Sequence, residues 1–330
     1  MGPWIFCIES NSQAVLESVA SLFAHRASYR APEQGRVFTC RVTDDPDAFF
    51  HLEAQLQGCP AVVSATKGIS IRYAYQSSRT LIGMDHTAIM QLDEGQPEQA
   101  NVFLDPTNYA PYLAGDAQRR IRADPEAFLY PLLAEWLRTW DACLIHCGAV
   151  VVNGHTVMFS GPPGSGKSTQ VLRLLLQGAH FLADDLAILR RSEQGLCMQP
   201  LREVANVSPI SKQHFPELEF LDRCPVRGDG KRMVDIHSIL GQSAAQEARP
   251  GAILRIHPDS ASWIIPCPEE DRLTGIENMA WFRSDPARTT RHFWLLMDWL
   301  SASRQWRVSQ GYLASHLSEL MHLLKQEFPA

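Results

Sequence analysis

The sequence lacks an excess of positive charge and any long apolar run. It holds 30 Lys and Arg against 36 Asp and Glu, a formal net charge of −6. This balance argues against general affinity for nucleic acid or anionic membranes. No apolar run approaches the length of a membrane span, and the start, MGPWIFCIESNS, lacks the basic segment of a signal peptide. We therefore expect a cytoplasmic protein with no nucleic-acid or membrane partner.

The cysteines lack the spacing of a metal site. The eight cysteines are scattered, and the closest group, Cys143 to Cys147 with His146 between them, has no second pair at zinc-finger spacing. We expect reduced, mostly buried thiols. Internal repeats and low-complexity tails are also lacking. With 330 residues, 45% hydrophobic and 20% charged, the chain can form one large domain or two moderate ones.

The pattern of apolar residues predicts two regions. Helical spacing over 12–25 is followed by short alternating runs between residues 36 and 104, which we interpret as a mostly β region. A further helix is predicted after Asp124, with Pro131 expected to kink it. We expect an α+β N-terminal region over 1–105 and a second domain over 106–330, with strands near 252–257 and 262–266 and two closing helices.

The segment 144–178 carries the strongest chemical signal. Asn153-Gly154 predicts a two-residue hairpin, and its second strand, 155–160, leads into GPPGSGKS, which fits the phosphate-binding pattern G-x-x-x-x-G-K-[ST]. A leucine-rich helix follows from Lys167 to Gln177 and ends at Gly178. We expect Lys167 to contact the β- and γ-phosphates of a nucleotide and Ser168 to ligate Mg²⁺. The predicted nucleotide-binding residues are Gly161, Pro162, Pro163, Gly164, Ser165, Gly166, Lys167, Ser168 and Thr169.

Two adjacent acids, Asp184 and Asp185, follow in the next apolar run. Asp184 lies 16 residues after Ser168 (184 − 168 = 16), the length of one helix, a turn and half a strand. Alternation along a strand predicts that the two side chains point to opposite faces. One carboxylate can then hold Mg²⁺ and the other can accept a proton from an attacking hydroxyl. The simpler alternative is that one acid faces solvent, and a lone His146 in an apolar run is more often a core residue than a catalyst.

Together, His146, the hairpin, GPPGSGKST and QGAHFLADD resemble the nucleotide site of HPr kinase/phosphorylase and, more distantly, ATP-dependent PEP carboxykinase. The resemblance is concentrated in residues 144–190. It implies an α/β, PEP-carboxykinase-like P-loop kinase core with a mixed sheet, ATP with Mg²⁺, and phosphorylation of a serine. It also implies Asp184 as the base, Asp185 as a magnesium ligand and His146 close to the phosphates. By approximate position, Glu203 is a further candidate metal ligand. Lys231 and Arg232, on a glycine-rich turn, are candidates to neutralise the transferred phosphoryl group, or else belong to a solvated basic loop.

The resemblance has limits. The partner-binding segment of HPr kinase/phosphorylase does not follow the acidic pair, and the N-terminal region does not look like that enzyme's regulatory domain. The chain looks more like lasso-peptide-type serine kinases, which phosphorylate a precursor peptide. The sequence therefore predicts a Mg-ATP-dependent serine kinase with a peptide or small-protein substrate, and leaves a homo-oligomer open. The alternatives are a kinase of a small-molecule hydroxyl and an ATP-binding or ATPase regulatory protein without phosphotransfer. A PEP-carboxykinase-like decarboxylase fits least, since its further ligands are not identified.

Overall fold

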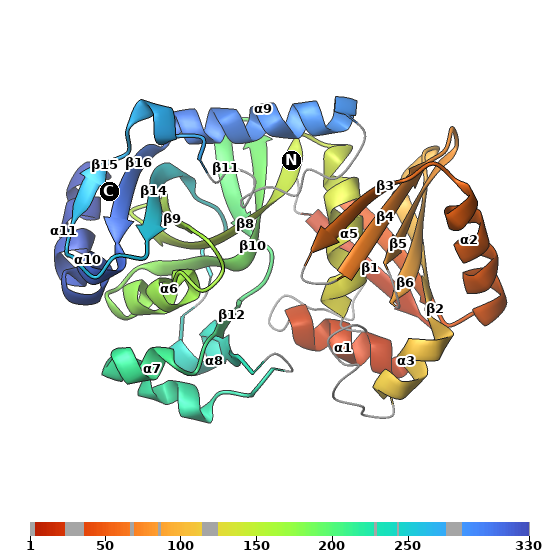
Figure 1. The fold of residues 1–330 in the computed structure, drawn as a ribbon, viewed down its shortest axis with the longest axis horizontal. Coiled ribbons are helices and arrows are strands. Elements are labelled where there is room, and N and C mark those ends of the chain that lie inside the picture. Colours follow the sequence, from red (N-terminus) through yellow and green to blue (C-terminus); the bar gives the residue numbers. More distant parts are fainter. Residues whose placement is uncertain are drawn as a thin grey trace. The chain divides into compact units, whose positions relative to one another are not determined.

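The computed structural model describes residues 4–23, 36–66, 69–84, 87–113, 125–227, 230–242, 244–274 and 286–329. The chain folds into two compact units, one formed mainly by the residues up to Trp140 and the other mainly by those from Asp141 onward (Figure 1). Each unit has its own seven-stranded sheet. Both sheets mix parallel and antiparallel pairs, so the expected α/β fold with a mixed sheet is confirmed.

The first unit is an α+β layer structure with strand order β1-β2-β7-β6-β5-β4-β3. The β1–β2 and β2–β7 pairs are parallel and the other pairs antiparallel. Its elements are β1 (Trp4–Ser10), α1 (Gln13–Phe23), β2 (Arg36–Thr43), α2 (Pro46–Gly58), β3 (Val62–Thr66), β4 (Ile69–Tyr75), β5 (Arg79–Met84), β6 (Ala88–Asp93), β7 (Gln96–Leu104), α3 (Pro106–Leu113) and α5 (Pro125–Arg138).

Two helices cover opposite faces of this sheet (Figure 1). The helix α2 buries Phe49, Leu52 and Leu56 against one face, and Trp136 of α5 packs against Phe6 and Phe38 from the other. The prediction of a mostly β region over 36–104 missed α2, whose capping Asp45 and following Pro46 are a helix-start signal. Because α3 and α5 belong to this unit, the structural boundary falls after Trp140 rather than after residue 105. Pro131 lies inside α5, and Asp124 lies outside the described residues.

The second unit has strand order β11-β10-β8-β9-β14-β16-β15 and a small β12-β13 sheet. The strands β9, β14 and β16 are parallel to one another, whereas β8 runs antiparallel to both β9 and β10. Its strands are β8 (Ala142–Val152), β9 (His155–Ser160), β10 (His180–Ser192), β11 (Gly195–Pro200), β12 (Val204–Val207), β13 (Arg232–Asp235), β14 (Arg249–His257), β15 (Ile264–Pro266) and β16 (Arg304–Ser309). Its helices are α6 (Lys167–Leu176), α7 (Ser211–His214), η2 (Pro216–Arg223), α8 (Ile236–Leu240), η3 (Glu269–Asp271), α9 (Pro286–Ala302), α10 (Gln310–Ser315) and α11 (Leu317–Glu327).

The large sheet of this unit has a core on each face. On one face α6 packs with η2, the small sheet and α11, and Val171, Leu175 and Leu320 are among the buried residues of this core. On the other face Leu295, Leu296 and Trp299 of α9 cover β8 and β10. The strands near 252–257 and 262–266 are found as β14 and β15, and the second of the two predicted closing helices is split into α10 and α11. Within the described ranges, every helix is too short or too polar to cross a lipid bilayer.

Candidate active site

The glycine-rich loop lies between the end of β9 and the start of α6, where the sequence predicts it. The hairpin before it has Asn153 and Gly154 both at positive φ, 50° and 77°, as an Asn-Gly turn requires. Gly164 and Gly166 are also left-handed, with φ of 82° and 96°, so a side chain at either would strain the loop. A Cβ on Gly161 would lie 2.8 Å from Ser165 Oγ, and the loop therefore needs glycine at this position too.

The side chain of Lys167 bonds back to the backbone of the glycine-rich loop. Its ammonium Nζ donates to the carbonyl oxygens of Gly161 at 2.8 Å and Pro162 at 3.2 Å. Partial burial lowers the pKa of Lys167, and the nearby charges of Asp184 and Asp185 oppose that effect. A phosphate bound in the loop can replace the two carbonyls as the partner of Nζ. Lys167 is therefore positioned to bind a phosphate in the loop.

Asp184 is buried directly beside this helix. Asp184 is 3% exposed and accepts a hydrogen bond from the Asn206 backbone N–H at 2.7 Å. The Ser168 hydroxyl lies near enough to lower the pKa of this carboxyl. Burial raises the pKa of Asp184, and the Ser168 hydroxyl and the Asn206 N–H only partly offset the rise. Asp184 thus lies near the hydroxyl that the sequence predicts as a magnesium ligand.

The expectation that Asp184 and Asp185 point to opposite faces is wrong. Asp185 has a φ of 83°, a conformation that breaks the alternation of a strand and that few residues other than glycine adopt. Its Oδ1 lies 3.0 Å from His146 Nδ1. His146 lies two residues before Gly148 on β8, so both positions are on the same face of the sheet. That face is covered by α6, because a Cβ on Gly148 would lie 3.1 Å from the Val171 side chain of α6. Both carboxylates therefore face the phosphate loop.

A buried arginine that the sequence analysis missed holds this arrangement. Arg202 is 2% exposed, and its Nη2 lies 3.5 Å from Asp185 Oδ2. In the amide orientation that satisfies its neighbours, the Asn206 side-chain oxygen accepts from Arg202 Nη2 at 2.8 Å and from Arg227 Nη1 at 3.1 Å. Arg202 lies between β11 and β12, and Asn206 lies in β12. In the sequence they stand out only as a charged residue and an amide in a mostly apolar run.

The three remaining predicted residues, Lys231, Arg232 and Glu203, lie in different surroundings. The charge of Lys231 is close enough to lower the pKa of Lys167, so Lys231 belongs to the electrostatic surroundings of the loop. Arg232 instead donates to the Cys224 carbonyl at 3.1 Å, which ties it to its own hairpin. Glu203 is buried immediately before β12, and its backbone carbonyl accepts from the Ile236 N–H at 3.1 Å. Its role as a metal ligand stays a prediction.

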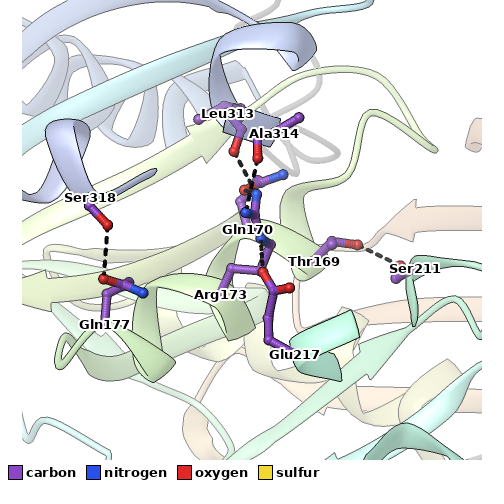
Figure 2. Close-up of polar contacts among 9 residues, drawn as sticks. All are labelled: Thr169, Gln170, Arg173, Gln177, Ser211, Glu217, Leu313, Ala314 and Ser318. Atoms are coloured by element: carbon purple, nitrogen blue, oxygen red, sulfur yellow. Dashed lines mark hydrogen bonds and ion pairs between the residues drawn. The ribbon is translucent and has the colours of Figure 1, made fainter. Parts of the chain in front are cut away.

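The far end of α6 is fixed by a buried arginine (Figure 2). Arg173 is 6% exposed; it pairs with Glu217 at 2.7 Å, donates to the carbonyls of Leu313 and Ala314, and lies 3.9 Å from the Phe215 ring centroid. At the loop end, Thr169 Oγ1 hydrogen-bonds Ser211 Oγ at 2.8 Å. Of the predicted nucleotide-binding residues, Thr169 therefore directs its side chain to α7.

The residues present fit a magnesium ion that is bound together with phosphate oxygens. The hydroxyl of Ser168 lies near the carboxylate of Asp184 and lowers its pKa, and oxygen donors of these two types suit Mg²⁺, which keeps several waters and takes one or two protein carboxylates. In the part of the chain that the structure describes, no group of three or more His, Cys, Asp or Glu gathers as a self-contained metal site. All eight cysteines, including Cys143 and Cys147 beside His146, are free thiols.

Comparisons with known proteins find distant similarity among solved structures. No protein-family model matches the chain, and no curated protein matches it. Among solved structures, the chain is similar to the HPr(Ser) kinase/phosphatase from Coxiella burnetii, at 13% identity and a TM-score of 0.32, over 56% of this chain and 93% of that one. The functional argument therefore rests on the geometry of the site itself.

Proposed function

We propose that this protein is a Mg-ATP-dependent kinase that transfers the γ-phosphoryl group to a serine hydroxyl of a peptide or small protein. The observation that carries the proposal is the His146–Asp185 pair, which is about one-third exposed on the face of the phosphate loop. Nucleotide binding alone does not need an oriented imidazole there. Activation of a hydroxyl does, because the attacking oxygen must lose its proton.

His146 is the proposed general base. Its Nδ1 lies 3.0 Å from Asp185 Oδ1, and a carboxylate in that position holds the ring in one tautomer with Nε2 free to take a proton. The left-handed backbone of Asp185 turns the carboxylate toward His146, and Arg202 holds its other oxygen. A strained residue that its surroundings hold in place is typical of catalytic sites.

Asp184 and Ser168 are the proposed magnesium-side residues. These roles differ from those that the family resemblance implies, since the buried Asp184 lies near Ser168 and accepts from the Asn206 N–H, whereas Asp185 contacts His146. A bound Mg²⁺ would supply charge neutralisation at the β- and γ-phosphate oxygens. Lys167 binds those oxygens, and Lys231 adds positive charge on the same side of the loop.

The acceptor class rests on the sequence resemblance to lasso-peptide-type serine kinases. The test incubates the full-length protein and Mg-ATP with three acceptor pools and detects products by mass spectrometry. The pools are peptides with serine in randomised flanks, the same peptides with alanine at that position, and small-molecule alcohols. We expect phosphate on serine peptides alone, and none with a Lys167→Met variant.

Other results would select the alternatives. Phosphorylated products in the alcohol pool alone would make the protein a small-molecule kinase. Phosphate released to water at equal rates with and without any pool, together with no phosphorylated peptide or alcohol, would support an ATPase and contradict the proposal.

A further inference from the structure

We propose that the half-buried ring of Trp263, with His257 beside it, forms the seat for the nucleobase of the bound nucleoside triphosphate. This inference rests on the proposed use of ATP and adds a binding subsite to it. The subsite belongs to the loop after β14, on the side of the phosphate loop away from the acidic pair.

The strand order fixes the direction in which the nucleotide extends. In the order β11-β10-β8-β9-β14-β16-β15, the acidic pair lies on β10, two strands to one side of β9. The γ-phosphate therefore points toward β10, and the nucleoside points toward β14 and β16. These two strands run parallel to β9, so their carboxyl ends meet the same edge of the sheet as the loop, where ligands of α/β sheets bind.

At that edge lies an aromatic group with a cation against it. The rings of His257 and Trp263 have centroids 5.5 Å apart, and the Arg307 guanidinium lies 6.0 Å from the Trp263 centroid. Arg307 Nε donates to His257 Nε2 at 3.2 Å, and burial together with Arg307 lowers the pKa of His257. A neutral imidazole beside an indole is a surface on which any flat base can stack.

The loop that carries Trp263 is fixed to the start of α10. The Trp263 backbone N–H donates to Ser309 Oγ at 3.1 Å and its carbonyl accepts from the Ser309 N–H at 3.1 Å. The Gly311 N–H donates to the Asp259 carbonyl at 2.9 Å. A Cβ on Gly311 would lie 2.1 Å from the Ser260 carbonyl oxygen, so the two segments touch closely and only glycine fits there.

The same segment reaches the phosphate loop. Gln310, between Ser309 and Gly311, donates from its side chain to the Ser165 carbonyl at 3.1 Å. On the neighbouring strand, the Ile256 carbonyl lies 3.4 Å from the position a Cβ on Gly161 would take. One continuous set of contacts therefore joins Trp263 to the residues that hold the phosphates, and the seat is formed before the nucleotide binds.

The test separates the nucleoside from the phosphates. Calorimetry measures the binding of ATP and of inorganic tripolyphosphate, each with Mg²⁺, to the wild-type protein and to Trp263→Ala, Trp263→Phe and Trp294→Ala. Trp294 is the matched control, an indole 59% exposed on α9. We expect Trp263→Ala to weaken ATP binding about tenfold, equivalent to about 1.4 kcal/mol, and to leave tripolyphosphate binding unchanged. Trp263→Phe keeps most of the ATP affinity, and Trp294→Ala changes neither.

Equal ATP affinity in Trp263→Ala and wild type would overturn the proposal, as would an equal loss for both ligands. Photolabelling of the wild-type protein with 8-azido-ATP needs no variant: we expect label on the peptide that contains residues 257–263, and label elsewhere alone would contradict the seat. If ATP binds as expected but no serine is phosphorylated, the proposed function fails and the seat stands. If serine is phosphorylated but Trp263→Ala binds ATP as tightly as wild type, the proposed function stands and the seat fails.

Discussion

Replacing Asp184 by asparagine should make the magnesium-free protein more stable while weakening its metal binding. Moving a carboxylate into a protein interior costs several kcal/mol, and Asp184 is 3% exposed. A hydrogen bond to a charged group returns about 1.5–3 kcal/mol; Asp184 accepts one from the Asn206 N–H, and the nearby Ser168 hydroxyl also favours the charged form. Since the pKa of Asp184 is raised, burial and the neighbouring Asp185 outweigh these favourable interactions.

Asparagine keeps the shape of Asp184 and can still accept from the Asn206 N–H. We expect a gain of about 1–2 kcal/mol at neutral pH, a rise of about 2–8 °C in the Tm of the transition that contains this unit. The sign follows from linkage: an acid whose folded pKa is raised binds more protons folded than unfolded. Its stabilising contribution is therefore complete at low pH and is lost as pH rises through the raised value. The advantage of the variant should accordingly grow with pH.

The assay is thermal unfolding without metal from mildly acid to mildly alkaline pH, repeated with ATP and with Mg-ATP. Mg²⁺ should add stability to the ATP-bound wild type and much less to the variant. Asp185→Asn is the control, because its side chain is 32% exposed and paired with His146; it should not stabilise the protein. A variant Asp184→Asn that is less stable than wild type at alkaline pH would refute the reasoning.

Three further predictions follow from the same geometry. His146→Gln should lower phosphotransfer about 10²–10⁴-fold while leaving ATP affinity unchanged; a variant that transfers phosphate as fast as wild type would exclude His146 as the base. Gly161→Ala should weaken ATP binding at least tenfold, because its Cβ would meet Ser165 Oγ at 2.8 Å; calorimetry showing unchanged affinity would contradict this. Arg173→Met should destabilise the second unit by about 2–4 kcal/mol in urea unfolding. The exposed Arg191→Met, which loses only surface ion pairs, should change stability by less than about 1 kcal/mol, and equal effects would contradict the role of Arg173.

The sequence by itself determined the local unit from β8 to α6. Asn153-Gly154, the glycines of the loop and the apolar spacing of the helix each restrict the backbone through short-range sterics and periodicity, so hairpin, loop and helix lie where the sequence predicts them. The helix α2 was not predicted although Asp45 and Pro46 signal its start, because the alternating strand patterns on both sides favoured a β interpretation of the whole region.

Only the tertiary structure decided where the carboxylates of Asp184 and Asp185 point. Alternation along a strand places Asp184 and Asp185 on opposite faces, but the positive φ of Asp185 turns both toward the loop. That conformation is maintained by His146 on β8 and Arg202 after β11, residues that sequence spacing cannot place beside it. Trp263 reaches the same edge of the sheet as the glycine-rich loop in the same way, through parallel pairing of strands distant in sequence. Long-range pairing depends on the whole chain packing at once, which is why short-range patterns identified the glycine-rich loop and the acidic pair but not Arg202 and Asn206 beside them.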